Sequence, residues 1–345
     1  MRMKKTRAIL YAILAAAFYA VNIPVSKLLL NRVGAMTMAA LLYLGAGIGI
    51  GIVSLFDRKE KREKLNGKDL PFVIGMIVLD IAAPILLMLG LSMGFASNAS
   101  LLGNFEIVAT ALIALAIFGE TVSKRLWLAI GLITLSSILL SLDGAESFRF
   151  SYGSLLVLAA TICWGFENNC TRKISSKSTY EIVILKGVFS GLGALAIALI
   201  QKEALPSLLS IALALLLGFV AYGLSIFLYV RAQNVLGAAK TSAYYAVAPF
   251  IGALLSFLFL KEKLTWMYLA ALAVMILGTA LVVMDTLIRN HIHVHTHTFT
   301  HTHDGSTHTH TVTHSHAHHH YVTDENHGHR HTRSELEKLP GALHR

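Results

Sequence analysis

The sequence predicts an all-α, polytopic membrane protein with ten transmembrane helices arranged as two inverted five-helix repeats. Of its 345 residues, 55% are hydrophobic and only 14% are charged, a balance too apolar for a surface exposed to water. The apolar residues fall into runs close to the roughly 20 residues that a helix needs to cross a bilayer. The later runs also repeat features of the earlier ones.

Ten apolar runs can be placed along the chain. The predicted spans are 7–30, 35–56, 70–91, 96–118, 124–142, 152–173, 179–200, 207–230, 238–260 and 264–286. The residues that follow the last predicted span are mostly polar and rich in histidine. The predicted organisation is a first five-helix repeat at 1–143, a second at 144–286 and a His-rich tail at 287–345.

Basic residues between the spans predict the orientation, because cytoplasmic loops collect Lys and Arg. With the N-terminus inside, the cytoplasmic segments hold 17 Lys and Arg, in 2–7, 58–68, 124–125, 172–177 and 231–240. The opposite side holds five: Arg32, Arg149, Lys202, Lys261 and Lys263. We therefore expect a multi-pass protein of the cytoplasmic membrane with both termini in the cytoplasm. A nucleic-acid partner is not expected, because no basic stretch is interleaved with aromatic residues.

The chain resembles itself at an offset of about 142 to 145 residues. The first and sixth spans align, 18–27 with 163–172, in an order of aromatic, small, apolar and polar residues. Two acidic pairs also coincide: Glu120 with Glu262, and Asp143 with Asp285. Because each repeat holds an odd number of spans, the second must be inverted relative to the first, which is an architecture of secondary transporters.

At these residues the sequence resembles the EamA branch of the drug/metabolite transporter superfamily, over roughly residues 7–286. The motifs that carry the resemblance are Tyr19-Ala20-Val21-Asn22, Trp164-Gly165-Phe166-Glu167, Gly119-Glu120, Lys261-Glu262 and Ala248-Pro249. The resemblance implies ten helices in two inverted halves, around a central cavity lined by the first, third, fourth, sixth, eighth and ninth spans. It also implies a substrate among amino acids, metabolites or drugs. The sequence departs from the family pattern at Glu167, where Asn is usual, and at Lys261, where Gly is usual.

Three of the ionisable residues inside predicted spans stand out: Asp80, Glu106 and Lys186. Charge in a bilayer is costly and marks a pathway or a proton relay by default. Asp80 and Glu106 fall at similar depth, and carboxyl groups in such a site have a raised pKa, so we expect one of them to exchange a proton during transport. The alternative is a structural carboxyl bonded to a neighbour such as Asn104 or Lys186. Lys186 itself either lines the cavity or extends toward the cytoplasm.

Five further residues lie on the first helices of the two halves and offer hydrogen bonds or a stacking face to a substrate. They are Tyr19, Asn22, Trp164, Glu167 and Asn168. For the two aromatic residues, anchoring at the membrane interface is the alternative role. Glu120 and Glu262 end their helices beside basic residues and are expected to be structural.

All 17 histidines fall within residues 291–345. No apolar periodicity accompanies them, so the tail is expected to be disordered. Neutral imidazole is a good ligand for Zn, Ni and other divalent ions, so the tail is expected to bind metal even though no cofactor is required for transport. The predicted ligands are His291, His293, His295, His297, His301, His303, His308, His310, His314, His316, His318, His319 and His320.

The function predicted from these features is a gradient-driven transporter of small metabolites such as amino acids, running as an exporter and coupled to protons. The expected partners are a small-molecule substrate and the lipid bilayer. Two alternatives stay open: a Zn, Ni or Co transporter loaded or gated by the tail, and a membrane sensor that does not transport. An enzyme is not expected, because no nucleophile with a base and no nucleotide-binding loop of the Gly-x-x-x-x-Gly-Lys-Ser/Thr kind occurs. The sequence does not specify the oligomeric state.

Overall fold

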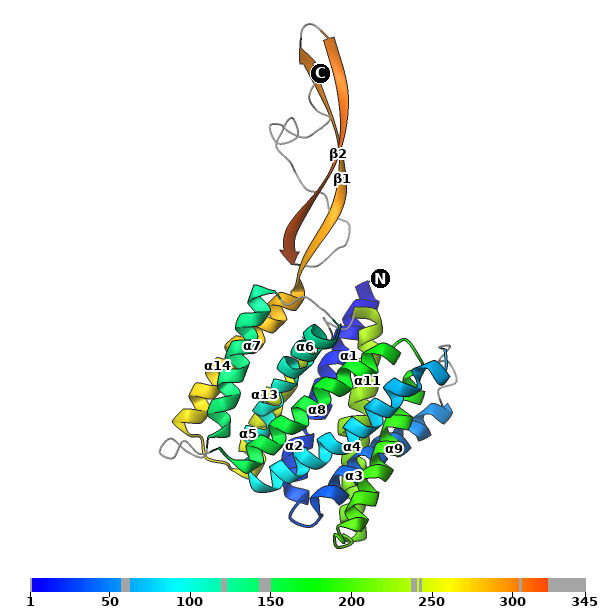
Figure 1. The fold of residues 1–345 in the computed structure, drawn as a ribbon, viewed down its shortest axis with the longest axis vertical. Coiled ribbons are helices and arrows are strands. Elements are labelled where there is room, and N and C mark those ends of the chain that lie inside the picture. The colour runs from blue at the N-terminus through cyan, green and yellow to red at the C-terminus, as the bar shows by residue number, and fades with distance from the viewer. Residues whose placement is uncertain are drawn as a thin grey trace. The chain divides into compact units, whose positions relative to one another are not determined.

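In the computed structural model the chain divides into two compact units, Met1–Val283 and Met284–Arg345 (Figure 1). The structure describes residues 2–56, 63–118, 123–142, 150–236, 241, 244–303 and 306–321. Over its described residues the first unit is helical, apart from one isolated bridge between Leu142 and Phe150. The second unit continues from the last helix into two β-strands.

The helices follow the predicted runs closely. In chain order they are α1 (Arg2–Ala20), α2 (Asn22–Leu29), α3 (Ala35–Phe56), the 3-10 helix η1 (Gly67–Asp69), α4 (Leu70–Met93), α5 (Ala96–Leu102), α6 (Phe105–Phe118), α7 (Lys124–Ser141), α8 (Tyr152–Ile174), α9 (Thr179–Ile200), α10 (Leu208–Gly218), the π-helix η2 (Phe219–Leu224), α11 (Ser225–Leu236), α13 (Ala248–Leu260) and α14 (Trp266–Leu287).

Eight helical segments in the described part of the chain are long and apolar enough to cross a membrane. They coincide with eight of the predicted spans. The predicted span 152–173 is present as α8, whose hydropathy is lowered by a polar stretch around Glu167. The predicted span 238–260 is represented by the shorter apolar helix α13, and residues 238–240, 242 and 243 of that span lie outside the described residues.

Several spans are interrupted near their middle. The first is divided at Val21 into α1 and α2, and the fourth at Gly103 and Asn104 into α5 and α6. The eighth contains the π-helix η2, a rare element that occurs often at functional sites. By contrast, Pro84 lies inside α4, which is continuous. Broken helices in a membrane are tolerated where protein or a cavity satisfies the freed backbone groups.

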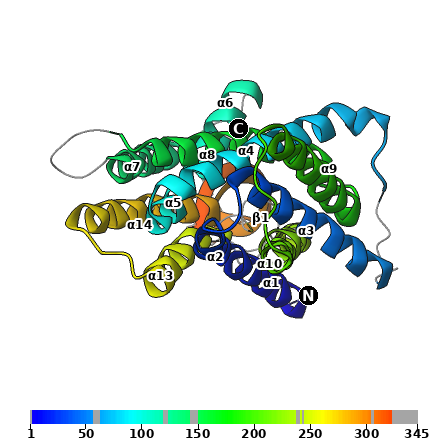
Figure 2. The same cartoon turned by 90° about the horizontal axis from the view of Figure 1, so that it is seen from below.

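The two predicted halves pack against each other through matching pairs of helices. The third span (α4) contacts the sixth (α8), and the first span (α1) contacts the eighth (α11). These two contacts are equivalent: the first and sixth spans are counterparts in the two repeats, and so are the third and eighth. The second and seventh spans, α3 and α9, form a further pair (Figure 2). One hydrophobic core runs through these interfaces, including Tyr43, Trp164 and Tyr222. At the edge, α7 and α14 lie side by side, and Ser136 Oγ donates to the carbonyl of Ala271 at 2.6 Å.

The α3–α9 crossing is close because glycines meet there. A Cβ atom on Gly187 would collide with the backbone of Gly47, and one on Gly47 would lie 2.6 Å from the backbone nitrogen of Val188. Small residues that let two helix backbones approach are a common means of helix association in membranes. The pair Gly47 and Gly187 therefore fixes the distance between the two halves at this interface.

Two β-strands lie in the second unit. Strands β1 (Ile288–His303) and β2 (Ser306–Tyr321) pair antiparallel over their whole length, with Ile288 opposite Tyr321 and His303 opposite Ser306. The physical reason is a period of two: histidine alternates with β-branched Thr, Val and Ile, which favour strands. The two residues between the strands are Asp304-Gly305, a sequence typical of a hairpin loop. Residues 322–345 lie outside the described part.

Candidate substrate and coupling site

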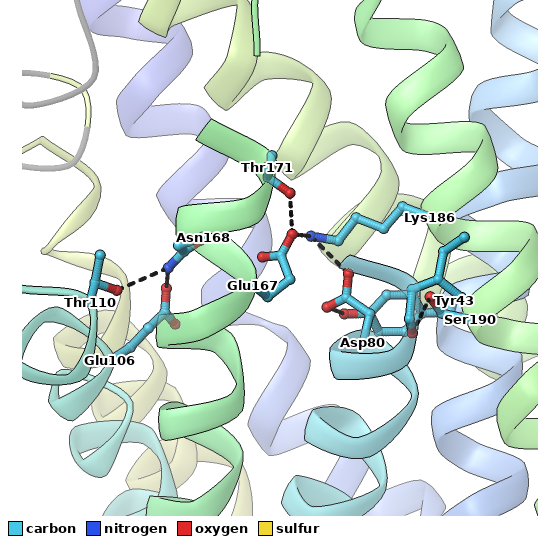
Figure 3. Close-up of polar contacts among 10 residues, drawn as sticks. Tyr43, Asp80, Glu106, Thr110, Glu167, Asn168, Thr171, Lys186 and Ser190 are labelled. Carbon is cyan, nitrogen blue, oxygen red and sulfur yellow. Dashed lines mark hydrogen bonds and ion pairs between the residues drawn. The ribbon is translucent and has the colours of Figure 1, made fainter. Parts of the chain in front are cut away.

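Three charged side chains from three helices meet in the interior of the helical unit. Lys186 Nζ of α9 lies 3.0 Å from Asp80 Oδ2 of α4 and 2.9 Å from Glu167 Oε1 of α8 (Figure 3). The exposed fractions are 8% for Lys186, 0% for Asp80 and 2% for Glu167. We call these three residues the charged triad. It carries two carboxylates and one ammonium group, so it has one negative charge in excess when all three are ionised.

Each carboxylate of the triad also accepts a hydrogen bond from a neighbouring hydroxyl group. Tyr43 of α3 donates its hydroxyl proton to Asp80 Oδ1 at 2.7 Å, and Thr171, one turn after Glu167 on α8, donates to Glu167 Oε1. Buried charges are tolerated only when they are paired and hydrogen-bonded, because desolvation costs several kcal/mol per ion. The ammonium group of Lys186 is therefore buried and paired with both carboxylates.

A second polar group lies on the other side of α8. Asn168 Nδ2 donates to Glu106 Oε1 at 2.6 Å and to Thr110 Oγ1 at 3.3 Å (Figure 3). Glu106 is in the first turn of α6, directly after the break at Gly103 and Asn104, where a negative charge interacts favourably with the helix dipole. Among the described residues Glu106 has no ion pair. Two consecutive residues of α8 therefore contact the two groups: Glu167 belongs to the charged triad, and Asn168 binds Glu106.

A buried polar residue, Asn104, lies two residues before Glu106. Neither of its side-chain amide atoms has a hydrogen-bond partner among the described residues, and the residue is 1% exposed. Ser100 Oγ, one turn earlier on α5, is also buried and has no partner within the described part of the chain. Unsatisfied buried polar groups are rare and require a reason such as a ligand contact. The break between α5 and α6 thus presents hydrogen-bonding groups next to Glu106.

Aromatic side chains connect the first helix of the chain to the charged triad. The ring of Tyr222 in η2 lies 5.1 Å from that of Tyr43 and 5.8 Å from that of Tyr19, measured between centroids. Asn22 Nδ2 donates to the hydroxyl of Tyr222 at 3.1 Å. On the far side of Tyr19, the ring of Tyr245 follows at 5.9 Å. A continuous set of contacts therefore leads from Asn22 through Tyr222 and Tyr43 to Asp80.

Comparison with known proteins identifies the family. A model of the EamA-like transporter family matches the chain twice, at residues 6–142 and 151–284. The chain belongs to the EamA-like transporter family. The two matched segments correspond to the two predicted repeats, and the resemblance read from the sequence motifs is confirmed.

An uncharacterized transporter of Methanothermobacter thermautotrophicus is 25% identical to this EamA-like protein over 292 residues, which is 77% of the chain and 83% of the relative. A protein with a solved crystal structure aligns with a TM-score of 0.58 at 16% identity, over 81% of this chain and 96% of the other. This second likeness concerns the fold alone.

The structure brings together most of the site residues predicted for this EamA-like protein. Asp80, Glu167 and Lys186 meet in the triad, Glu106 meets Asn168, and Asn22 and Tyr19 join the aromatic set. Trp164 is 7% exposed and belongs to the common core, so it lies in the interior. Asp80 and Glu106 have separate partners, Lys186 for Asp80 and Asn168 for Glu106. Asp80 matches the alternative of a carboxyl bonded to Lys186.

Five residues of the site were not predicted from the sequence: Tyr43, Thr110, Thr171, Tyr222 and Tyr245. Each is a hydroxyl-bearing residue within a helical segment, and such residues are common in membrane helices. The available signal was the spacing of Thr171, four residues after Glu167, because residues at that spacing are neighbours on a helix surface. The tyrosines gave no comparable signal, since their contacts join segments as distant as Tyr43 and Tyr222.

Proposed function

We propose that this EamA-like protein is a secondary transporter of small metabolites such as amino acids, driven by a gradient and running as an exporter. It crosses the cytoplasmic membrane ten times as two inverted five-helix halves, with both termini in the cytoplasm. Its activity is transport and not catalysis. The observation that carries the proposal is the buried charged triad. Charged residues inside apolar membrane helices mark a substrate or ion pathway by default, and this chain belongs to a transporter family.

The chemistry of the triad fits a substrate with two opposite charges. Lys186 offers an ammonium group to a carboxylate, while Asp80, Glu167 and Glu106 offer carboxylates to a cationic amine. A substrate that carries both groups can exchange partners with the existing ion pairs and leave no charge uncompensated. This exchange supports an amino acid or a related zwitterion as the substrate class.

Proton coupling follows from the charge count. The triad has one negative charge in excess, and Glu106 adds a carboxyl with only an amide and no cation as its described partner. When the amine of a substrate leaves, a proton on one of these carboxyls restores the balance at least cost. Glu106 is the best placed, because it lies at the break between α5 and α6 and its described partner is the neutral amide of Asn168.

The metal-transporter alternative has less support from the membrane unit. That unit has no histidine in its sequence, and the described side chains include no group of three or more His, Cys, Asp or Glu close enough to hold an ion. Two carboxylates and a lysine are a poor site for a soft transition metal, which prefers imidazole and thiolate ligands. The sensor alternative makes no use of the triad.

The test is solute flux in proteoliposomes that contain the purified protein and a mixture of amino acids, with an imposed pH gradient. We expect efflux that depends on the gradient. We expect Asp80→Asn to lower the rate at least about tenfold, because it breaks a buried ion pair. We expect Glu106→Gln to transport without dependence on the gradient.

The matched control is Glu63→Gln, which removes a carboxylate whose only described partner is Lys177 in an exposed pair. Its flux should equal that of the wild type. If Asp80→Asn and Glu106→Gln both kept the full rate and an unchanged pH dependence, the proposal would be wrong. Absence of flux for every amino acid tested would favour the sensor.

A further inference from the structure

Two interrupted helices of the first half border one glycine of the second half. A Cβ atom on Gly252 of α13 would lie 3.1 Å from Ser100 Oγ of α5 and 3.2 Å from the carbonyl oxygen of Ala20, the last residue of α1. A Cβ atom on Gly103, directly after α5, would lie 3.9 Å from Pro249 Cγ in the first turn of α13. The break between α1 and α2 and the break between α5 and α6 therefore face the same stretch of α13. We call this place the break junction.

The oxygen atoms at the break junction lack their usual partners. Pro24 has no N–H group, so the carbonyl of Ala20 cannot accept the helical hydrogen bond that residue 24 would otherwise donate. Ser100 Oγ has no hydrogen-bond partner in the described part of the chain, and the side chain of Asn104, one turn later, has none there either. Ala20, Ser100 and Asn104 are all buried. Buried polar groups are satisfied by protein, bound water or a ligand, so these three call for an occupant.

The chemistry of the three groups suits a hard cation. A backbone carbonyl, a hydroxyl and an amide oxygen are neutral oxygen ligands, and carbonyls freed at helix breaks coordinate Na⁺ in other secondary transporters. Oxygen ligands bind a hard cation at about 2.3–2.6 Å in the case of Ca²⁺. A cation at the Cβ position of Gly252 therefore requires the two nearest oxygens, 3.1 Å and 3.2 Å away, to approach by less than about 1 Å.

The charge of the cation follows from its surroundings. None of the three oxygen groups carries a charge, and burying an ion costs more as its charge increases. A single positive charge is therefore favoured over a double one. Glu106 lies two residues after Asn104 and supplies a nearby carboxyl group whose described partner is a neutral amide.

We propose that the break junction binds a small monovalent cation, Na⁺, through Ser100 Oγ, Asn104 Oδ1 and the carbonyl oxygen of Ala20, with Gly252 leaving the necessary space. The ion connects α1 and α5 of the first half to α13 of the second. It binds close in sequence to two groups described above, since Asn22 follows Ala20 by two residues. This inference goes beyond the proposed transport function and does not depend on it.

The alternative occupant is a water molecule, which would satisfy the same groups whether or not sodium is present. Two variants separate these occupants. Asn104→Leu replaces an amide by an apolar group of similar size, a change that is neutral or stabilising when no ligand requires the amide. Gly252→Ala places a Cβ atom against Ser100 Oγ and the carbonyl of Ala20. The matched control, Ser256→Ala, removes a buried hydroxyl one turn further along α13, where Ser256 Oγ donates to the carbonyl of Gly252 at 2.8 Å.

The experiment uses the full-length protein in detergent. The midpoint of thermal unfolding is measured against the concentration of NaCl, with choline chloride added to keep the ionic strength constant, and binding of radioactive sodium is measured under the same conditions. We expect the midpoint of the wild type and of Ser256→Ala to rise with sodium and to reach a plateau, because a ligand that binds only the folded state stabilises it. We expect Asn104→Leu and Gly252→Ala to show no rise, or to need at least about tenfold more sodium for it.

The measurement in choline alone shows whether the variants are folded, and there Asn104→Leu should be at least as stable as the wild type. If that variant did not fold, Gly252→Ala would decide the question. A midpoint of the wild type that does not depend on sodium, or an equal sodium response in the wild type and both junction variants, would overturn the proposal. Neither readout measures flux, so a protein that binds sodium here but moves no amino acid would refute the transport proposal and leave this one standing.

Discussion

Two lysines hold left-handed backbone conformations, and each precedes a glutamate that caps a distant helix. Lys261, at the end of α13, has φ 53° and ψ 37°, and Glu262 accepts hydrogen bonds from the amides of Ala96 at 2.7 Å and Ser97 at 3.0 Å. Lys202 has φ 55°, and Glu203 accepts from the start of α3. In both cases the turn directs a carboxylate at a helix N-terminus, where negative charge is stabilising.

Replacing Lys261 by glycine should stabilise the protein. The left-handed conformation costs a residue with a Cβ atom about 1 kcal/mol, and glycine adopts it without that cost. We expect Lys261→Gly to raise the free energy of unfolding by about 1 kcal/mol and the midpoint of thermal unfolding with it. Lys261→Ala is the control, since it removes the same charge and keeps the Cβ atom. If the alanine variant were as stable as the glycine variant, backbone conformation would not be the cause.

The sequence alone identified the charged residues of the site because charge is rare inside apolar runs. Asp80, Glu106 and Lys186 were found in this way, and Glu167 through the family motif. Their pairing was not predictable, since it depends on which faces of α4, α8 and α9 meet. Glu203 was missed because a glutamate in a polar loop has no distinguishing feature until its partner, the start of α3, is known.

At the scale of the helix, the α3–α9 crossing gives a sharp prediction. Gly187→Ala should lower the midpoint of thermal unfolding, because the added Cβ would collide with the backbone of Gly47 and the helices must separate. Gly51→Ala on α3 is the matched control: a Cβ there meets nothing within 4 Å, and alanine favours a helix over glycine by about 1 kcal/mol. We expect the control to be equal to the wild type or more stable. A stable Gly187→Ala variant would contradict the close crossing.

Hydropathy predicted the helices well and their interruptions poorly. Eight spans were confirmed by length and composition, because a run of apolar residues specifies a membrane helix almost regardless of order. The break at Gly103 and Asn104 and the π-helix at Phe219–Leu224 leave hydropathy unchanged, so the sequence did not indicate them.

At the scale of the whole molecule, the matching helix pairs explain why the site lies where it does. The α4–α8 and α1–α11 interfaces exchange with each other when the halves are exchanged, so both border the centre of the unit. Asp80 and Glu167 come from the first of these pairs, and Tyr19 from α1 of the second contacts Tyr222 beside α11. A site shared by two oppositely oriented halves can be exposed to either side by a relative movement of the halves.

The central claim is that two five-helix halves of opposite orientation surround this site, and membrane topology tests it most directly. Single cysteines at positions 7, 202, 263 and 290, in a protein with Cys163 and Cys170 replaced by serine, can be labelled in intact cells with a maleimide that does not cross membranes. The account predicts that positions 202 and 263 react in intact cells, and that positions 7 and 290 react only after the membrane is opened. Labelling of positions 7 and 290 from different sides would contradict an even number of crossings, and with it the inverted pair.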